Sequence, residues 1–173
     1  EGRVLNRVVR YTDRGWQLEA DPRHAESAIE QLGVGSGKPV ITPGIDDEDA
    51  EGVEVEIEGA DSSRFRGVAA RCIFLSFEKP DIQYATKEVC RKMAKPTTGS
   101  LRRLKRIAHY LHGKPRLVWD YVMQDECDVV DIFTDSSWAG CHRTRKSSSG
   151  GVVMLGNHTI KTWSHTQAIV AKS

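Results

Sequence analysis

The stretch VVDIFTDSSWAGCHRTRKSSSGG, from Val129 to Gly151, runs a strand-like sequence into a single aspartate. The β-branched and aromatic residues up to Phe133 are typical of a β-strand, and Asp135 stands at its end. Tryptophan, basic and hydroxyl side chains follow. A carboxylate at the end of a buried strand is costly unless it is paired, exposed or bound to a metal. The partner of Asp135 is therefore the main question that this sequence raises.

Two interpretations fit Asp135 taken alone. Asp-Ser-Ser is typical of a turn in which the aspartate accepts a backbone hydrogen bond. Alternatively, Asp135 is a magnesium ligand, because hard divalent cations prefer carboxylate oxygens. Asp131 lies on the same strand face but roughly 13 Å away, at about 3.3 Å per residue, which is too far to share a metal ion. A two-metal site would need further carboxylates.

The residues after Pro115 predict strands. RLVWDYVM alternates apolar side chains with mixed neighbours, and VVDIFTD, SGGVVMLG and TIKTWSH follow it, with a turn at Asn157-His158. Consecutive strands joined by short Gly/Asn turns pair with their neighbours in sequence. The last three strands are therefore expected to form an antiparallel meander.

Three helices are expected between Ser62 and Gly113. Apolar spacing predicts the first around Arg64–Phe77 and the second from Pro80-Asp81 to about Met93. Thr97 is expected to cap the third, which Gly113 ends. One face of this third helix is apolar, and the other carries Arg102, Arg103, Lys105, Arg106 and His109.

The N-terminal part predicts a hairpin over residues 3–20, with a turn at Asp13-Arg14-Gly15. Asp21 is expected to cap a helix whose first residue is Pro22. A glycine- and proline-rich linker follows. Within it VEVEIE alternates well enough for a strand, which would lie at a sheet edge because one face is wholly charged.

Charge is strongly segregated along the chain although the net charge is +1. Residues 46–61 contain nine acids and no base, whereas residues 87–116 contain ten bases and the single acid Glu88. This asymmetry predicts a solvated acidic connector and a basic face for a polyanion. The alternative for the basic run is a solubilising surface.

Composition indicates an ordinary soluble protein of 173 residues, 39% hydrophobic and 28% charged. No apolar run approaches the roughly 18 residues of a membrane span, so no membrane partner is expected. The four cysteines form no CxxC pair and the six histidines lack zinc-ligand spacing. Free thiols in a reducing intracellular compartment are expected. The N-terminus, without Met or a signal peptide, resembles the middle of a larger protein.

The chain resembles the Pol polyproteins of copia-type LTR retrotransposons. FTDSSWAGCHRTRKSSSGG and the later WSHTQ are similar to the start of that family's ribonuclease H domain, with its aromatic-[ST]-D-x-D-W-A-G and R-[KR]-S-[TS]-S-G patterns. FRGVAARCIFLSFEKPDIQYA and KRIAHYLHG resemble the helical thumb, and ADPRHAESAIEQLG resembles the segment that closes the palm. Pro80-Asp81-Ile82 and Asp135–Gly140 are the most specific parts of the match.

The resemblance implies an α+β fold in four parts. Residues 1–45 would end the reverse transcriptase palm with a β-hairpin and a helix, and residues 46–61 would form an acidic linker. Residues 62–114 would form a three-helix thumb-like bundle. Residues 115–173 would supply the first three antiparallel strands of a truncated ribonuclease H-like fold.

The resemblance also implies an activity for the parent polyprotein. Its reverse transcriptase copies RNA into DNA, and its ribonuclease H cuts the RNA strand of the hybrid with Asp135 as a catalytic Mg²⁺ ligand. Basic side chains would contact the hybrid backbone without reading sequence. The candidate contacts are Arg102, Arg103, Lys105, Arg106, Arg143, Arg145 and Lys146, and for the last three a solvated hairpin is the alternative. The implied partners are an RNA–DNA hybrid or other duplex and the remainder of Pol, in a cytoplasmic virus-like particle or the nucleus.

Two substitutions and two boundaries depart from the family pattern. Ser137 replaces the second Asp of D-x-D, and Ala70 replaces a small Gly in the first thumb helix. The S-x-E-A-E motif with the next carboxylate would follow Ser173, and the polymerase Y-x-D-D strand would precede Glu1. We therefore expect the 173-residue chain to catalyse nothing on its own. The alternatives are a non-catalytic nucleic-acid-binding remnant of a decayed or domesticated element, and a purely structural fragment.

Overall fold

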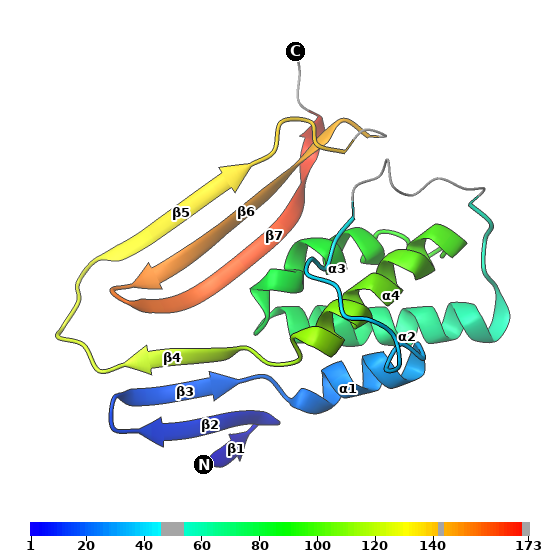
Figure 1. Cartoon of the computed structure of the whole chain (residues 1–173). Coiled ribbons are helices and arrows are strands. Elements are labelled where there is room, and N and C mark those ends of the chain that lie inside the picture. The colour runs from blue at the N-terminus through cyan, green and yellow to red at the C-terminus, as the bar shows by residue number, and fades with distance from the viewer. Residues whose placement is uncertain (46–53, 142–143, 171–173) are drawn as a thin grey trace.

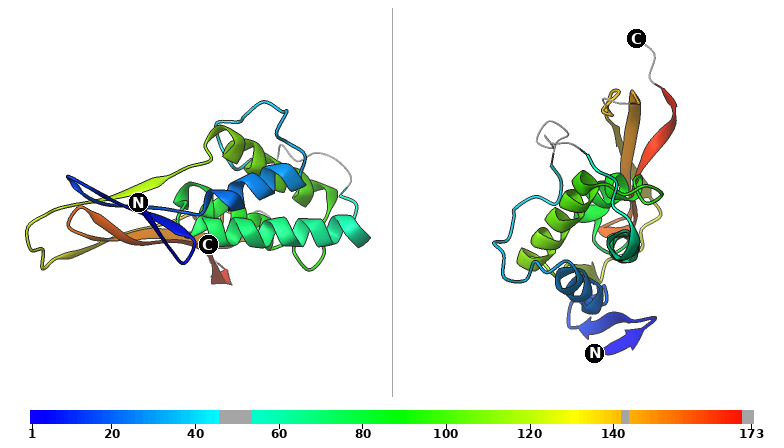
Figure 2. Two further views of the ribbon diagram at one scale, coloured as in Figure 1. Left: turned by 90° about the horizontal axis from the view of Figure 1, so that it is seen from below. Right: turned by 90° about the vertical axis from the view of Figure 1, so that its right-hand side faces the viewer.

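The computed structural model describes residues 1–45, 54–141 and 144–170. Within these ranges the chain forms four α-helices, one short 3-10 helix and seven strands in two antiparallel sheets. Figure 1 shows the helices grouped together, with both sheets extending from the same side of them, and the left view of Figure 2 shows this from below. The predicted α+β class is confirmed, whereas its division into thumb and ribonuclease H parts remains a prediction.

The first 20 residues form three strands: β1 (Gly2–Val4), β2 (Arg7–Thr12) and β3 (Gly15–Glu19). The predicted hairpin is confirmed, with Val9 opposite Leu18. A tight turn at Leu5 and Asn6, whose φ angles are 50° and 65°, divides the expected first strand in two. A positive φ is uncommon for leucine, so residue preferences did not predict this turn.

The helices are α1 (Pro22–Gln31), α2 (Gly59–Ser76), α3 (Gln83–Cys90) and α4 (Thr98–Gly113), with the 3-10 helix η2 (Pro80–Ile82) directly before α3. The caps expected at Asp21 and Thr97 are confirmed, whereas the cap expected from Lys79-Pro80-Asp81 is wrong, because neither η2 nor α3 has a side-chain cap. The Asp21 carboxylate accepts from the Arg23 N–H at 3.1 Å, and Thr97 forms a capping box with Ser100. These bonds satisfy backbone N–H groups that have no partner within the helix.

Two helix boundaries differ from the prediction. α2 begins at Gly59 rather than near Arg64, and α3 ends at Cys90, so Met93 lies beyond it. Met93 still packs against the core from outside the helix. Apolar spacing therefore located the buried side chains better than it located the helix ends.

The expected edge strand in VEVEIE is wrong for the part of it that the structure describes. Glu56 makes one isolated bridge to Thr97, and residues 54–58 form no strand. The Thr97 hydroxyl donates to the Glu54 carboxylate, Oγ1 to Oε2, at 2.5 Å. The segment therefore lies beside the N-terminus of α4, where negative charge is favoured. Val53 lies outside the described residues.

The core lies among the helices. Its larger side chains that are at most 2% exposed are Phe65, Val68, Cys72, Leu75, Ile82, Val89, Leu104, Ile107 and Leu111. Their spacing of three and four residues places them on the inner faces of the helices.

Of the described helices, none is long and apolar enough to span a bilayer.

Strand β4 (Val118–Val122) pairs with β3 and completes a sheet of order β1-β2-β3-β4. The buried Glu19 carboxylate accepts from Arg116 Nε at 2.5 Å and Nη2 at 2.7 Å, and from Arg10 Nη1 at 2.7 Å. The Arg116 guanidinium lowers the pKa of Glu19 to about 2 against the opposing effect of burial, and Arg10 adds to the lowering. The Arg116–Glu19 ion pair fixes the chain just before β4 and so helps to set the register of β4 on β3.

Residues before and after the helices thus share one sheet. Gln17 Nε2 donates to the Asp120 carboxylate across it at 2.8 Å, over 103 residues of sequence. The ranges 1–45, 46–61, 62–114 and 115–173 remain predictions as domain boundaries.

The second sheet consists of β5 (Val130–Ser136), β6 (Lys146–Leu155) and β7 (His158–Val170), in the order β5-β6-β7. The predicted antiparallel meander is confirmed, with Gly156 at φ 57° in its tight turn. All seven residues of β5 are exposed, so the expectation of a buried strand before Asp135 is wrong. The physical reason is that β5 lies at one edge of the sheet, whereas α3 packs against β7 at the opposite edge.

A buried lysine joins the ends of two helices. Lys79, 1% exposed, donates from Nζ to Asp81 Oδ2 and to the Lys114 carbonyl, both at 3.1 Å. The Tyr110 hydroxyl donates to the same Asp81 oxygen at 2.8 Å. Burial, with a smaller effect of the Asp81 carboxylate, raises the pKa of Tyr110 to about 12. The network connects η2 to the C-terminal end of α4, where the chain leaves for β4.

Candidate nucleic-acid interface and metal-ligand position

Asp135 lies near the end of β5, opposite Gly150 of β6, which lies opposite Ser164 of β7. Directly opposed residues of an antiparallel sheet share one face. Ser148 and Thr162 are each two residues away along their strands, so they lie on that face as well. These five positions define the side of the sheet toward which Asp135 points.

Helix α3 packs on this same face. Lys87 Nζ donates to Ser148 Oγ at 2.5 Å, and Gln83 Nε2 donates to Thr162 Oγ1 at 2.8 Å. Asp135 therefore lies on the face that α3 contacts, but on the strand farthest from it.

The hydrogen bonds that close this end of the sheet come from Ser137. Its N–H donates to the Ser148 carbonyl, and its hydroxyl accepts from the Ser148 N–H, both at 3.0 Å. Within the described ranges, no hydrogen bond or ion pair engages the exposed Asp135 carboxylate. The turn-capping bond considered for Asp135 is thus absent among the described residues, and Ser137 makes the bonds that join β5 to β6 here.

A magnesium site requires more ligands than the single carboxylate of Asp135. Residues 1–45, 54–141 and 144–170 contain no group of three or more His, Cys, Asp or Glu side chains that could hold a metal ion. Asp131 shares the face of Asp135 but lies opposite Met154, about 13 Å along the strand. The described residues therefore do not form a magnesium site by themselves, and Asp135 stands as a single accessible carboxylate.

The predicted basic face of α4 is present, but its members differ in their contacts. Arg102 and Lys105 are exposed, and Arg103 is half-buried. Arg106, also half-buried, donates from Nε to the Gly44 carbonyl at 2.9 Å and from Nη2 to Thr42 Oγ1 at 2.8 Å. Arg106 thus holds the segment after α1 against α4, which competes with a phosphate contact.

The first turn of α4 already favours a negative group. The Thr97 hydroxyl lowers the pKa of Glu54, burial opposes the shift, and Lys92, Arg103 and Arg102 lower it further. Helix N-termini attract anions through their unpaired N–H groups and the helix dipole. Arg102 and Arg103 therefore act on the Glu54 carboxylate together with the N-terminus of α4.

The basic residues after Asp135 lie at the same end of the sheet as that aspartate. Arg145 is exposed with φ 54°, and Lys146 is half-buried at the start of β6, opposite Val170. Arg143 lies outside the described residues.

Two further cations reach this end of the sheet, Lys87 of α3 and Arg91 directly after that helix, and sequence reasoning did not include them. Lys87 contacts Ser148 as described, and Arg91 Nη2 donates to the Cys141 sulfur at 3.5 Å. Both are paired with Glu88, at 3.0 and 2.9 Å. Their sequence signal was membership of the basic run with a spacing of four residues.

The Cys141 thiol has a lowered pKa of about 7. The nearby Thr144 hydroxyl contributes most to the lowering, burial opposes it, and the Thr144 N–H and the Arg91 guanidinium add to the lowering. Burial instead raises the pKa of Cys72 to about 12 and that of Cys90 to about 11. Cys141 therefore has the most thiolate character of these three free cysteines.

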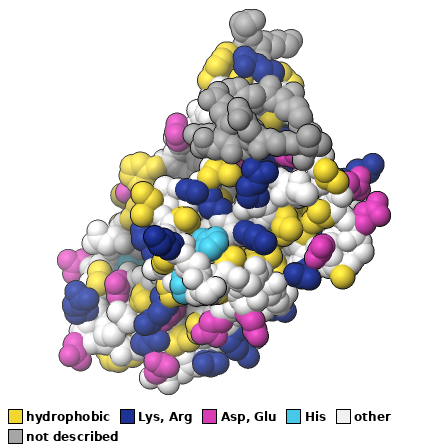
Figure 3. Space-filling model, turned by 45° about the vertical axis from the view of Figure 1, so that its right-hand side comes forward, with side chains coloured by type: hydrophobic (Ala, Val, Ile, Leu, Met, Phe, Trp, Pro, Cys, Tyr) yellow, Lys and Arg dark blue, Asp and Glu magenta, His cyan; other side chains and the backbone are white. Residues whose placement is uncertain are grey.

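Figure 3 shows how charge is distributed over one side of the molecule. Lys and Arg side chains are interspersed there with hydrophobic and acidic ones and do not merge into one continuous patch. The charge segregation of the sequence therefore becomes a set of separate basic positions on this face.

Known proteins of Arabidopsis thaliana are similar to this chain. It is 31% identical over 160 residues to the uncharacterized mitochondrial protein AtMg00810, covering 87% of this chain and 62% of that protein. It is 33% and 30% identical, over 113 residues each, to the retrovirus-related Pol polyproteins from transposons RE1 and RE2. The chain is a homologue of copia-type retrotransposon Pol polyproteins.

This Pol homologue spans a limited part of its relatives. The alignments with RE1 and RE2 cover 65% of this chain and 8% of each polyprotein. No family model matches the chain, and no solved structure has significant similarity to it. The family resemblance is thus confirmed, and the assignment of individual residues to polymerase or ribonuclease H roles stays a prediction.

Proposed function

We propose that this chain is the part of a Pol polyprotein that connects reverse transcriptase to ribonuclease H and binds an RNA–DNA hybrid. In this proposal, residues 62–114 are the thumb-like bundle and Asp135 is the first Mg²⁺ ligand of ribonuclease H. The observation that carries the proposal is Asp135 itself. It is an exposed carboxylate without a partner among the described residues, within the most specific part of the family match.

The contact with the hybrid is assigned to the first half of α4. Arg102 and Lys105 are exposed, and Arg103 lies beside a helix terminus that favours negative groups. Contacts of this kind position a duplex without reading its sequence. Arg106 contributes by fixing the Thr42–Gly44 segment against the helix.

The metal site requires carboxylates from other parts of Pol. Mg²⁺ usually binds one or two carboxylates together with substrate phosphate oxygens and water. When bound, it stabilises negative charge at the phosphate that is cut. The contribution of this chain is one accessible carboxylate, with Arg145 and Lys146 at the same end of the sheet.

The non-catalytic alternative keeps the basic positions of α4 and loses cleavage. It is supported by the lack of a three-ligand group among the described residues. In both the catalytic and the non-catalytic alternative the chain binds an RNA–DNA hybrid. Both also place the protein inside the cell, in a virus-like particle or the nucleus. Cleavage by the Pol polyprotein that carries this sequence separates them.

The α4 contact predicts a specific salt effect. Arg102→Gln with Lys105→Gln should weaken binding of the chain to an RNA–DNA hybrid and reduce the slope of log affinity against log salt by about 1.8. The reason is that each neutralised phosphate contributes about 0.9. Fluorescence anisotropy over a salt series measures both quantities.

A matched control changes the same charge elsewhere. Arg3 and Arg14 are exposed in the N-terminal strands and the turn between β2 and β3. Their replacement by Gln should leave the slope unchanged. An equal loss of slope in both double variants would show that binding follows net charge and not the α4 surface.

A further inference from the structure

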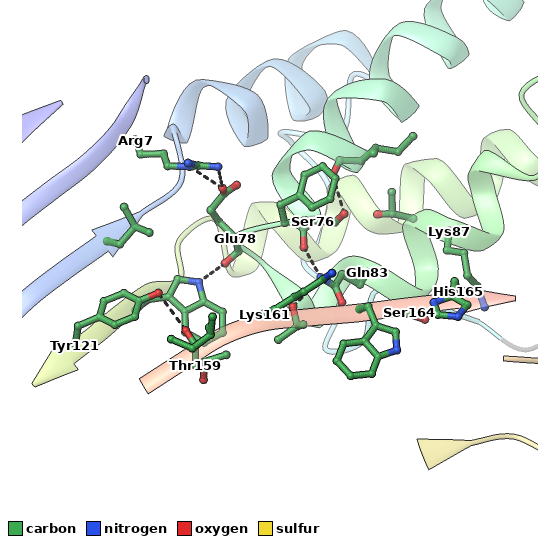
Figure 4. A pocket seen from close by; sticks show the side chains of 18 residues that line it. Arg7, Ser76, Glu78, Gln83, Lys87, Tyr121, Thr159, Lys161, Ser164 and His165 are labelled. Carbon is green, nitrogen blue, oxygen red and sulfur yellow. Dashed lines mark hydrogen bonds and ion pairs between the residues drawn. The ribbon is translucent and has the colours of Figure 1, made fainter. Parts of the chain in front are cut away.

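A cleft of about 620 Å³ lies between the helices and β7, and the proposed function makes no use of it. The end of α2 and the start of α3 form one side, β7 forms another, and β3 and β4 contribute at one end (Figure 4). Its volume is within the range of about 300–1,000 Å³ that is usual for small-ligand sites.

An unpaired hydroxyl lines this cleft. Thr86 of α3 is 2% exposed, and its Oγ1 has no hydrogen-bond partner. Buried hydroxyls nearly always have a partner, and one without it requires an explanation. A polar ligand in the cleft would supply both a donor and an acceptor to Thr86.

The charge lining the cleft is mainly positive. Arg7, Lys87 and Lys161 line it together with one acid, Glu78. Arg7 Nε donates to Glu78 at 2.7 Å, and Lys87 pairs with Glu88, which lies outside the cleft. Lys161 is exposed on β7, and its side chain forms no ion pair or hydrogen bond within the described ranges. It is therefore the accessible cation for an anionic ligand.

Aromatic rings at the β4 end are held in place. Trp119 Nε1 donates to the Glu78 carbonyl at 2.7 Å, and the Tyr121 hydroxyl donates to the Thr159 carbonyl at 3.3 Å (Figure 4). Phe77, directly after α2, also lines the cleft and is 65% exposed. Fixed aromatic side chains next to a cation are the combination that binds bases and phosphates of unpaired strands.

We infer that this cleft binds one unpaired nucleotide of a single-stranded nucleic acid. The base lies against the aromatic end, Lys161 contacts a phosphate, and the Thr86 hydroxyl bonds to a polar group of the nucleotide. A space of this size admits one nucleotide and not a paired duplex. The inference rests on the proposed function because it takes nucleic acid as the ligand, but its surface is separate from the α4 contact.

Two variants test it in the full chain. Thr86→Val keeps the side-chain shape and removes a hydroxyl that has no partner, so stability in urea should be unchanged or higher. Its affinity for a fluorescein-labelled oligo(dT) should fall about fivefold, the equivalent of one hydrogen bond. Lys161→Gln should lower that affinity and reduce the salt slope by about 0.7, the value for one phosphate of a single strand.

Controls separate this site from α4. Lys95→Gln, an exposed change between α3 and α4, should leave oligo(dT) affinity unchanged. Both cleft variants should bind an RNA–DNA hybrid like the parent chain, whereas Arg102→Gln with Lys105→Gln should weaken hybrid binding. Oligo(dT) binding that is insensitive to Thr86→Val and Lys161→Gln would overturn the inference, as would equal losses for hybrid and oligo(dT). Cleft-dependent oligo(dT) binding without hybrid binding would support this site while contradicting the proposed α4 function.

Discussion

Asp135→Asn, in a Pol polyprotein that carries this sequence, is expected to reduce magnesium-dependent cleavage of the RNA strand of a hybrid by roughly a hundredfold or more. Asparagine keeps the shape of the side chain but removes its charge and one ligating oxygen. A loss of several kcal/mol of charge stabilisation gives at least this factor, because each 1.36 kcal/mol is tenfold in rate. Labelled RNA released from the hybrid measures the effect.

Asp131→Asn is the matched control. Asp131 lies on the same face of β5, is also exposed, and is four residues away from Asp135. The polyprotein with Asp131→Asn should cleave the RNA strand of the hybrid at the rate of the parent protein. Near-normal cleavage by Asp135→Asn at limiting magnesium would remove this aspartate from the metal site, and equal losses in both variants would point to damage of β5.

Asp81→Ala is expected to reduce the free energy of unfolding by about 3 kcal/mol, more than Lys79→Met does. Removing one partner of a buried ion pair leaves the other charge uncompensated, which costs about 3–5 kcal/mol. We take the lower value because the Asp81 side chain is 27% exposed. Of its partners among the described residues, the buried Lys79 ammonium would keep the Lys114 carbonyl and the Tyr110 ring, 5.9 Å from its nitrogen.

Lys79→Met removes the buried charge itself. Asp81 can then still accept from the Tyr110 hydroxyl and from water, so a loss of about 1–2 kcal/mol is expected. The double variant should be more stable than Asp81→Ala alone, because it contains no unpaired buried ammonium. Urea unfolding followed by circular dichroism gives all three values. A loss of unfolding free energy for Asp81→Ala no larger than that for Lys79→Met would contradict this account of the network.

Features governed by neighbouring residues were predictable from the sequence. The caps at Asp21 and Thr97 depend on side chains that bond backbone groups two or three residues ahead. The apolar spacing from Phe65 to Leu75 directly reflects which helix face is buried. The meander was predictable for a similar reason, since its strands pair in sequence order.

Features governed by contacts between distant residues were not predictable from the sequence. The pairing of β4 with β3 depends on residues such as Gln17 and Asp120, about a hundred positions apart, and no local pattern specifies that partner. The exposure of β5 follows from its place at the sheet edge away from α3, whereas its β-branched sequence is equally typical of a buried strand.

The candidate site was predictable to different degrees in its parts. Asp135 and the exposed cations of α4 were found from motif and charge. The engagement of Arg106 with Thr42 and Gly44 was not, because a loop 62 residues earlier in the chain provides its acceptors. The cleft was missed entirely, since Thr86, Trp119 and Lys161 come from three separate elements and carry no shared motif.

The salt dependence of hybrid binding by the unmodified chain tests the central claim most directly. Arg102, Arg103 and Lys105 provide up to three phosphate contacts, and each contributes about 0.9 to the slope. Affinity for an RNA–DNA hybrid, measured by anisotropy over a potassium chloride series, should therefore fall linearly on a log–log plot with a slope of about −2 to −3. Affinity that does not change with salt, or no binding at low salt, would contradict the claim that this chain binds the hybrid backbone.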